Sequence, residues 1–248
     1  MIYLYTANVN PIFDLYDNHR DIFEQRMSLL CPERRKKVEE VKQPKDKARA
    51  MGAGLLLQCA LQDYLSLSVG NKDCGHREEK ELKRIFSFDR EELQTARLQR
   101  HLEIAYGEKG KPYLPEFPGL YFSLSHSGDY VALALSCHPV GVDIQEEREL
   151  SDGLQKKYFT EEENAGGARP FEIFSGKESY IKYTGEGMSR SFTDFSVNFK
   201  KKTVTVNHHT VAYVRKYELE GGKYVLCVCD RCEDIVSYAE QHTYSISE

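Results

Sequence analysis

The chain of 248 residues contains no tryptophan, only four methionines and no apolar run long enough to cross a membrane. Its seven cysteines are an odd number, and a chain of this length can bury a core without disulfides. The first residues lack the basic lead and long apolar segment of a secretory signal, and the net charge of −5 argues against general binding to nucleic acid. We therefore expect a reduced, cytoplasmic, globular protein that binds neither nucleic acid nor membrane.

Three common motifs of catalytic and nucleotide-binding sites are also missing: the Gly-x-x-x-x-Gly-Lys-Ser/Thr loop, the Gly-x-Gly-x-x-Gly turn and the Gly-x-Ser-x-Gly elbow. Without that elbow, Ser125 and His126 favour an anion site over a nucleophile and its base, because adjacent residues seldom point at each other. Cys227, Cys229 and Cys232 form a partial zinc site, or Cys227 and Cys229 fill the inner face of an apolar strand over 224–229. The strand is favoured because no fourth ligand lies nearby in the sequence.

The hydrophobic pattern predicts helices, then strands, then helices, then strands. After a short first strand, helices are expected near 19–30, 32–41, 45–66, 90–102, 154–164 and 171–184. The polar residues 71–84 predict a surface loop. Strands are expected in a meander over 119–124, 130–135 and 140–144, and again near 194–199, 203–206, 210–218 and 223–229. This order predicts an α+β fold of two similar halves, 1–137 and 138–248, with a crevice between them.

A carboxylate interrupts the apolar strand over 140–144. Strand alternation places Val140, Val142 and Ile144 in the core and turns Asp143 and Gln145 to the other face. Oxygen ligands side by side suit a hard cation such as Mg²⁺, although an aspartate at a strand end is commonly a turn or cap residue.

The helix near 171–184 carries Glu178 and Lys182 four residues apart on one face, with Lys177 beside them. An ordinary helix salt bridge is one interpretation, and it would contribute only a few tenths of a kcal/mol. The other is phosphoryl transfer, in which Glu178 takes a hydroxyl proton or binds metal and the lysines neutralise charge on phosphate oxygens.

Basic residues gather in the run RRKK at 34–37 and again at Lys42, Lys45, Lys47 and Arg49. Lys111 adds one more cation from a rigid Gly-Lys-Pro turn. A local anion site and a solvated helix face both fit the charge pattern of 34–37.

Three segments, FSLSHSG at 122–128, VGVDI at 140–144 and FSGKESYIK at 174–182, occur in this order with glycines at 185 and 187. On these motifs the chain resembles the surfactin-synthetase-activating (Sfp-like) 4′-phosphopantetheinyl transferases over nearly its whole length. The resemblance implies a monomer of two α+β halves related by a pseudo-twofold axis, with coenzyme A in the crevice between them. It also implies transfer of 4′-phosphopantetheine to a serine of an acyl or peptidyl carrier protein in peptide, polyketide or fatty-acid assembly, with release of 3′,5′-ADP.

The resemblance also assigns roles to residues. Asp143 and Glu178 would hold Mg²⁺, Glu178 would act as or orient the base, and Lys182 would stabilise the pyrophosphate or the leaving group. Coenzyme A would be bound by a set of polar and basic residues: Arg34, Lys37, Lys111, Ser125, His126 and Lys182.

Two positions depart from the family pattern. Gln145 stands where many members carry a second acidic ligand, so it either ligates the metal weakly or orients a water. Phe174 replaces a usual tryptophan. The neutral amide at Gln145 leaves open a coenzyme A-binding or carrier-binding protein without catalysis, and a metal-dependent phosphohydrolase is a further alternative.

Overall fold

The computed structural model describes residues 2–69, 82–86 and 102–232. The chain starts with a strand and four helices: β1 (Ile2–Asn8), α1 (Asn10–Asn18), α2 (Arg20–Met27), α3 (Pro32–Glu40) and α4 (Pro44–Val69). The helices predicted near 19–30, 32–41 and 45–66 are confirmed. We did not predict α1, although its apolar residues recur at helical spacing and it buries Ile12 and Leu15.

Strands and shorter helices make up the rest of the described chain. The middle part contains β2 (Leu82–Phe86), β3 (Ala105–Tyr106), β4 (Pro112–Tyr113), β5 (Tyr121–Ser127), β6 (Tyr130–Ser136) and β7 (Gly141–Glu146). The last part contains α6 (Asp152–Tyr158), α7 (Glu161–Ala165), α8 (Pro170–Thr184), β8 (Ser196–Asn198), β9 (Thr203–Val206), β10 (His209–Leu219) and β11 (Tyr224–Asp230).

The predicted surface loop over 71–84 is wrong at its end, because residues 82–84 belong to β2, which runs parallel to β1. Pairing with a strand at the start of the chain is non-local, so the charged sequence around Lys83 gave no sign of it. Residues 71–81, and all of the helix predicted over 90–102 except its last residue, lie outside the described residues.

The strands form two larger sheets and one small hairpin. The first sheet has the order β2-β1-β6-β5, and the second has the order β7-β11-β10-β9-β8. Between the described strands, all pairings are antiparallel except that of β1 with β2. The α+β class is therefore confirmed.

The predicted meander of three strands is wrong at its third member. β5 and β6 form an antiparallel hairpin, but β7 joins the other sheet beside β11, about 80 residues further along the chain. β7 still lies next to β5, where serine hydroxyls of β5 accept hydrogen bonds from its backbone amides. The two sheets are thus joined through the hydroxyls of Ser123, Ser125 and Ser127, a row that we call the seam.

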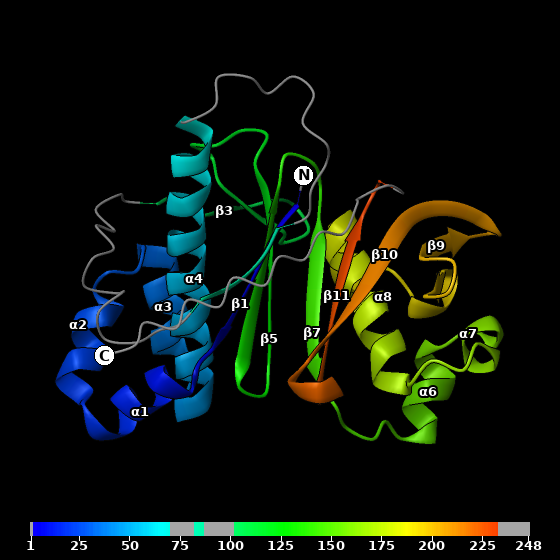
Figure 1. The fold of residues 1–248 in the computed structure, drawn as a ribbon, viewed down its shortest axis with the longest axis horizontal. Coiled ribbons are helices and arrows are strands. Elements are labelled where there is room, and N and C mark those ends of the chain that lie inside the picture. Colours follow the sequence, from blue (N-terminus) through cyan, green and yellow to red (C-terminus); the bar gives the residue numbers. More distant parts are fainter. Residues whose placement is uncertain (1, 70–81, 87–101, 233–248) are drawn as a thin grey trace.

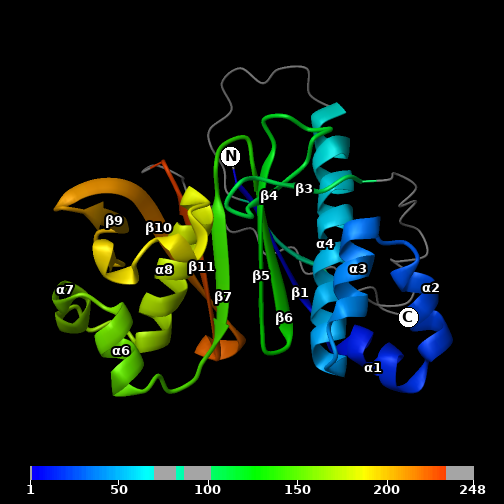
Figure 2. The ribbon, with the colours of Figure 1, turned by 180° about the vertical axis from the view of Figure 1, so that it is seen from behind.

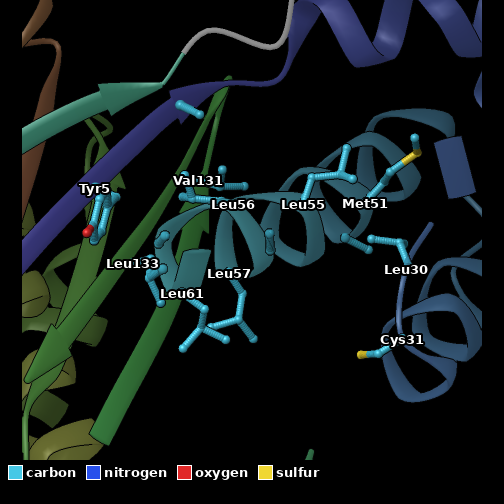
Figure 3. Close-up of a cluster of buried hydrophobic side chains, with 14 of the residues drawn as sticks. Tyr5, Leu30, Cys31, Met51, Leu55, Leu56, Leu57, Leu61, Val131 and Leu133 are labelled. Carbon is cyan, nitrogen blue, oxygen red and sulfur yellow. The ribbon is translucent and has the colours of Figure 1, made fainter. Parts of the chain in front are cut away.

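The elements are arranged in four layers, with the two sheets between two groups of helices (Figure 1). Helices α1 to α4 cover the first sheet, and α6 to α8 lie on the far side of the second, as the view from behind also shows (Figure 2). The largest core lies between α4 and the first sheet, where leucines of α4 meet Val131 and Leu133 of β6 (Figure 3). A second core fills the space between the sheets, and a third lies between α8 and the second sheet.

Helix α8 lies unusually close to β7. A Cβ atom on Gly141 would clash with the carbonyl oxygen of Ser179 and the amide nitrogen of Tyr183, so glycine is required where the strand touches the helix. The helix starts with a proline in its first turn and ends at Gly185, which adopts the left-handed conformation at φ 73°. This packing brings the polar face of β7 to the helix.

Among the described helices, none combines the length and the apolar character needed to span a bilayer.

Candidate active site

Asp143 lies in the middle of β7 and is almost completely buried, with 2% of its surface exposed. The predicted alternation is confirmed, because Val140, Val142 and Ile144 pack in the core between the two sheets. The backbone carbonyl of Asp143 accepts a hydrogen bond from Ser175 of α8 at 3.1 Å. A buried carboxylate therefore faces the helix that carries the other acid predicted for the site.

Three donors surround the Asp143 carboxylate. Its Oδ1 accepts hydrogen bonds from Ser125 Oγ at 2.7 Å and from Lys182 Nζ at 2.6 Å. Its Oδ2 accepts one from Gln145 Nε2 at 2.9 Å. The structure therefore brings together four of the predicted residues, and it directs the amide nitrogen of Gln145, rather than its oxygen, at Asp143.

Glu178 lies one turn before Lys182 on α8, as predicted, but Lys182 pairs with Asp143. Within the described residues, the structure contains no hydrogen bond or ion pair to the Glu178 carboxylate. Burial and the nearby negative charge of Asp143 raise the pKa of Glu178, while Lys182 opposes the shift. The described structure therefore lacks the ordinary helix salt bridge between Glu178 and Lys182. The Lys182 ammonium group pairs with Asp143 of β7 instead, and the carboxylates of Asp143 and Glu178 are neighbours.

Glu178 and Lys182 face a pocket of about 370 Å³ formed by four parts of the chain. Its walls come from α3, the β3–β4 hairpin, β5 and the end of α8, and they include Arg34, Lys37, Tyr106, Lys109, Lys111, Phe122, Ser123, Glu178, Lys182 and Gly187. Five cationic side chains line it against one acid. Such an excess of positive charge in a concave site favours a polyanionic ligand.

Arg34 and Lys37 are positioned by α3 at the wall of the pocket. Arg34 is 8% exposed, donates from Nη2 to the carbonyl of Ala50 at 2.9 Å, and has no hydrogen-bond partner at Nε among the described residues. Burial lowers the pKa of Lys37, and the charge of Arg34 lowers it further. A bound anion would stabilise the charged forms of these two adjacent, partly desolvated cations.

Lys111 lines the same pocket, but its ammonium group is bound to backbone. Its Nζ donates to the carbonyls of Tyr183 at 2.8 Å and Val140 at 3.2 Å, so the β3–β4 hairpin is tied to α8 and to the start of β7. Burial lowers the pKa of Lys111 to about 8. Its contact with a ligand stays a prediction.

Ser125 and His126 differ in their surroundings although they are adjacent on β5. Ser125 is buried and contacts Asp143 and Lys182. His126 is exposed at the opposite face of the strand. Desolvation by neighbouring elements lowers the pKa of His126, and the positive charges of Arg49, Lys182 and Lys37 lower it further.

Lys177 does not lie at this site. It is completely buried, forms an ion pair with Glu163 at 2.9 Å, and donates to the carbonyls of Phe192 and Phe195. These three contacts use all the protons of the ammonium group. The proposal that Lys177 neutralises phosphate charge is therefore corrected, and its role is to hold α8 against α7 and the segment before β8.

The individually predicted site residues did not include Lys109, Tyr106 or the two outer serines of β5. The repeat of serine at 123, 125 and 127 is the signal that could have identified the seam, since alternate residues of a strand share a face.

No cluster of three or more potential His, Cys, Asp or Glu ligands occurs in the described part of the chain. Cys227 and Cys229 lie in the apolar core between α8 and the second sheet, as the strand interpretation predicts, whereas Cys232 packs against the core between the sheets. Cys227 and Cys229 are buried thiols on β11, where burial raises the pKa of each.

The sequence of the second sheet and α8 matches a known protein family. Residues 139–229, which contain Asp143, Glu178 and Lys182, match the 4′-phosphopantetheinyl transferase superfamily. A 4′-phosphopantetheinyl transferase of Bacillus subtilis is 31% identical over 156 residues, covering 57% of this chain and 69% of the relative. The 4′-phosphopantetheinyl transferase Sfp of Bacillus subtilis strain 168 is 28% identical over 236 residues, covering 88% of this chain and 92% of the relative. A third, the 4′-phosphopantetheinyl transferase ffp of Bacillus subtilis, is 34% identical over 150 residues, covering 53% of this chain and 66% of the relative.

The chain therefore belongs to the Sfp-like 4′-phosphopantetheinyl transferases, enzymes that phosphopantetheinylate carrier proteins. This confirms the family and the enzyme class that the three sequence motifs predicted.

Proposed function

We propose that the chain transfers the 4′-phosphopantetheine group of coenzyme A to a serine hydroxyl of an acyl or peptidyl carrier protein and releases 3′,5′-ADP. The observation that carries this proposal is the meeting of Asp143, Glu178 and Lys182 beside a pocket lined with cations. Coenzyme A has a diphosphate and a separate 3′-phosphate, so its negative charge matches the cations of this pocket. The two carboxylates, Asp143 and Glu178, form what we call the acidic corner of the site.

The residues at this corner fit Mg²⁺. Two carboxylates lie close enough for Asp143 to raise the pKa of Glu178, and a cation between them would relieve that repulsion. Mg²⁺ is commonly held by one or two carboxylates, with waters and phosphate oxygens completing its shell. Asp143 and Glu178 would hold the ion, which would polarise the diphosphate and neutralise its charge. The predicted metal contact of Gln145 requires its amide oxygen, and it stays a prediction.

Glu178 is suited to accept the proton of the carrier serine. No hydrogen bond or ion pair occupies its carboxylate among the described residues, and burial raises its pKa toward the working range of a general base. The serine oxygen then forms a bond to the β-phosphorus of coenzyme A, and the bond from that phosphorus to the oxygen of 3′,5′-ADP breaks. Lys182 lies next to the same corner and neutralises charge on the phosphate oxygens.

Three more of the predicted ligands of coenzyme A line the pocket. Arg34 and Lys37 on α3 supply two cations for its phosphates, and Lys111 of the β3–β4 hairpin supplies a third. Ser125 and His126 of β5 are not among the lining residues, and a contact of His126 with coenzyme A stays a prediction. The pocket has walls from elements on both sides of residue 137, which supports a ligand bound between two parts of the chain.

We further propose that 1–137 and 138–248 are similar halves related by a pseudo-twofold axis. The strands of the first sheet all precede residue 137 and those of the second all follow it, which supports this division. The enzyme is proposed to be a cytoplasmic monomer that serves nonribosomal peptide, polyketide or fatty-acid assembly.

The test is incubation of the protein with coenzyme A, Mg²⁺ and apo carrier proteins from several pathways. We expect the carrier to gain the mass of one phosphopantetheine group while 3′,5′-ADP appears in equal amount. Release of product without a carrier would instead indicate a phosphohydrolase. Binding of coenzyme A without any 3′,5′-ADP would indicate a protein that has lost catalysis.

A further inference from the structure

The seam between the two sheets is built from alternate serines of β5. Ser123, Ser125 and Ser127 accept backbone amide hydrogens from residues 142, 144 and 146 of β7, at 3.0, 3.3 and 3.0 Å. These hydroxyls stand where the carbonyls of a paired strand would otherwise lie. As hydrogen-bond acceptors for β7, the three serines are equivalent.

Ser125 differs from the other two because it also reaches the active site. Its hydroxyl donates to Asp143 Oδ1 at 2.7 Å and accepts a second hydrogen bond from Lys182 Nζ at 2.9 Å. A serine hydroxyl has one proton and two acceptor positions. With the amide of Ile144, these contacts use all three.

These contacts also determine which oxygen of Asp143 remains available. Among the described residues, Oδ1 accepts from both Ser125 and Lys182, whereas Oδ2 accepts only from Gln145. Each carboxylate oxygen has about two lone-pair positions. Oδ1 is therefore filled and Oδ2 keeps one position for a cation.

We propose that Ser125 is a positioning residue, which fixes the Asp143 carboxylate and the Lys182 ammonium so that Asp143 presents Oδ2 to the metal. This inference rests on the proposed function. It differs from the role that the resemblance implies, because a hydroxyl with all three positions in use has none left for coenzyme A. Ser125 is 7% exposed and is not among the residues that line the pocket.

The test compares Ser125→Ala with Ser127→Ala, which removes an equivalent acceptor from the seam without touching Asp143. Binding of Mn²⁺, as a probe for Mg²⁺, is measured by the electron paramagnetic resonance signal of the free ion, with coenzyme A present. Loss of a residue that orients a metal ligand typically weakens metal affinity about 10- to 100-fold. We expect such a loss in Ser125→Ala and affinity like that of the wild type in Ser127→Ala.

A second variant separates positioning from packing. Ser125→Cys fills nearly the same volume with a weaker donor and acceptor, so it should also lose Mn²⁺ affinity, and the Mg²⁺ concentration for half-maximal transfer should rise in parallel. If the wild type binds Mn²⁺ and Ser125→Ala and Ser125→Cys bind it equally well, the inference is overturned while the proposed function stands. A raised KM for coenzyme A with unchanged Mn²⁺ affinity also overturns it. A wild type that neither binds Mn²⁺ nor transfers the group overturns both.

Discussion

Lys182 Nζ lies 2.6 Å from Oδ1 of Asp143 and forms no ion pair with Glu178, its neighbour one turn earlier on the same helix. The ammonium therefore compensates the buried carboxylate of β7. Glu178 lies near Asp143 without a partner of its own in the described structure, and burial and the charge of Asp143 raise its pKa. This unequal distribution of charge leads to separate expectations for the two acids and the lysines around them.

Replacement of Glu178 by Gln should abolish most activity and stabilise the metal-free protein at pH 8. Burial and the charge of Asp143 raise the folded-state pKa of Glu178 above its ordinary value of 4.5. The folded state therefore binds more protons than the unfolded state between the two pKa values, and stability falls as pH rises through this window. Glutamine does not titrate, so the variant avoids this loss of stability. Loss of a general base lowers the transfer rate by about 100-fold or more.

Thermal unfolding of both proteins in a chelating buffer measures the effect. The stability advantage of Glu178→Gln should be present at pH 8 and absent below the ordinary pKa, where Glu178 is protonated in both states. A variant that is less stable than the wild type at pH 8 contradicts the assignment of uncompensated charge.

Replacement of Lys177 by Met should destabilise the fold and leave the chemistry intact. The change leaves the buried carboxylate of Glu163 without its partner, and breaking a buried pair in this way costs about 3–5 kcal/mol. Urea unfolding should show this loss. The double variant Glu163→Gln/Lys177→Met should recover part of it, because no buried charge then remains.

Lys182→Met is the matched comparison on the same helix. It should lose turnover with a smaller effect on stability, since Lys182 is partly exposed. Transfer per folded molecule should stay near the wild-type value in Lys177→Met. The reverse pattern, with turnover lost at Lys177 and kept at Lys182, would show that their roles have been exchanged.

Lys111 should give a pH-dependent contribution to stability. Burial lowers its pKa in the folded protein from 10.5 to about 8, so the unfolded chain binds more protons between these values and stability rises with pH there. Lys111→Met retains the aliphatic stem but loses this dependence. It also leaves the carbonyls of Tyr183 and Val140 without their donor, which costs about 1–3 kcal/mol where water is excluded.

Urea unfolding of the wild type and Lys111→Met at pH 7.5 and 9.5 measures this contribution. The advantage of the wild type should be larger at the higher pH. An advantage that shrinks with rising pH would indicate that the folded protein favours the charged amine.

Local patterns in the sequence predicted the parts of the site that depend on a single element. Alternation placed Asp143 opposite its apolar neighbours on β7, and helical spacing placed Glu178 and Lys182 on one face of α8. Both results follow from the repeat of the backbone alone. The family motifs then joined the two elements in one site.

Contacts between elements could not be predicted in this way. The choice of Lys182 between Asp143 and Glu178 depends on the close approach of β7 to α8 at Gly141. The burial of Lys177 depends on Glu163 in α7, and α7 is positioned only by the tertiary fold. Sequence spacing could rank these charges as candidates, but it could not say which of them meet.

We propose that transfer takes place at the acidic corner formed by Asp143 and Glu178. The Asp143→Asn variant tests this through its rate of phosphopantetheine transfer to an apo carrier, with coenzyme A binding measured on the same protein. We expect coenzyme A affinity within a few-fold of the wild type, since the cations of the pocket are retained, and a transfer rate at least about 100-fold lower. A transfer rate near that of the wild type would contradict it.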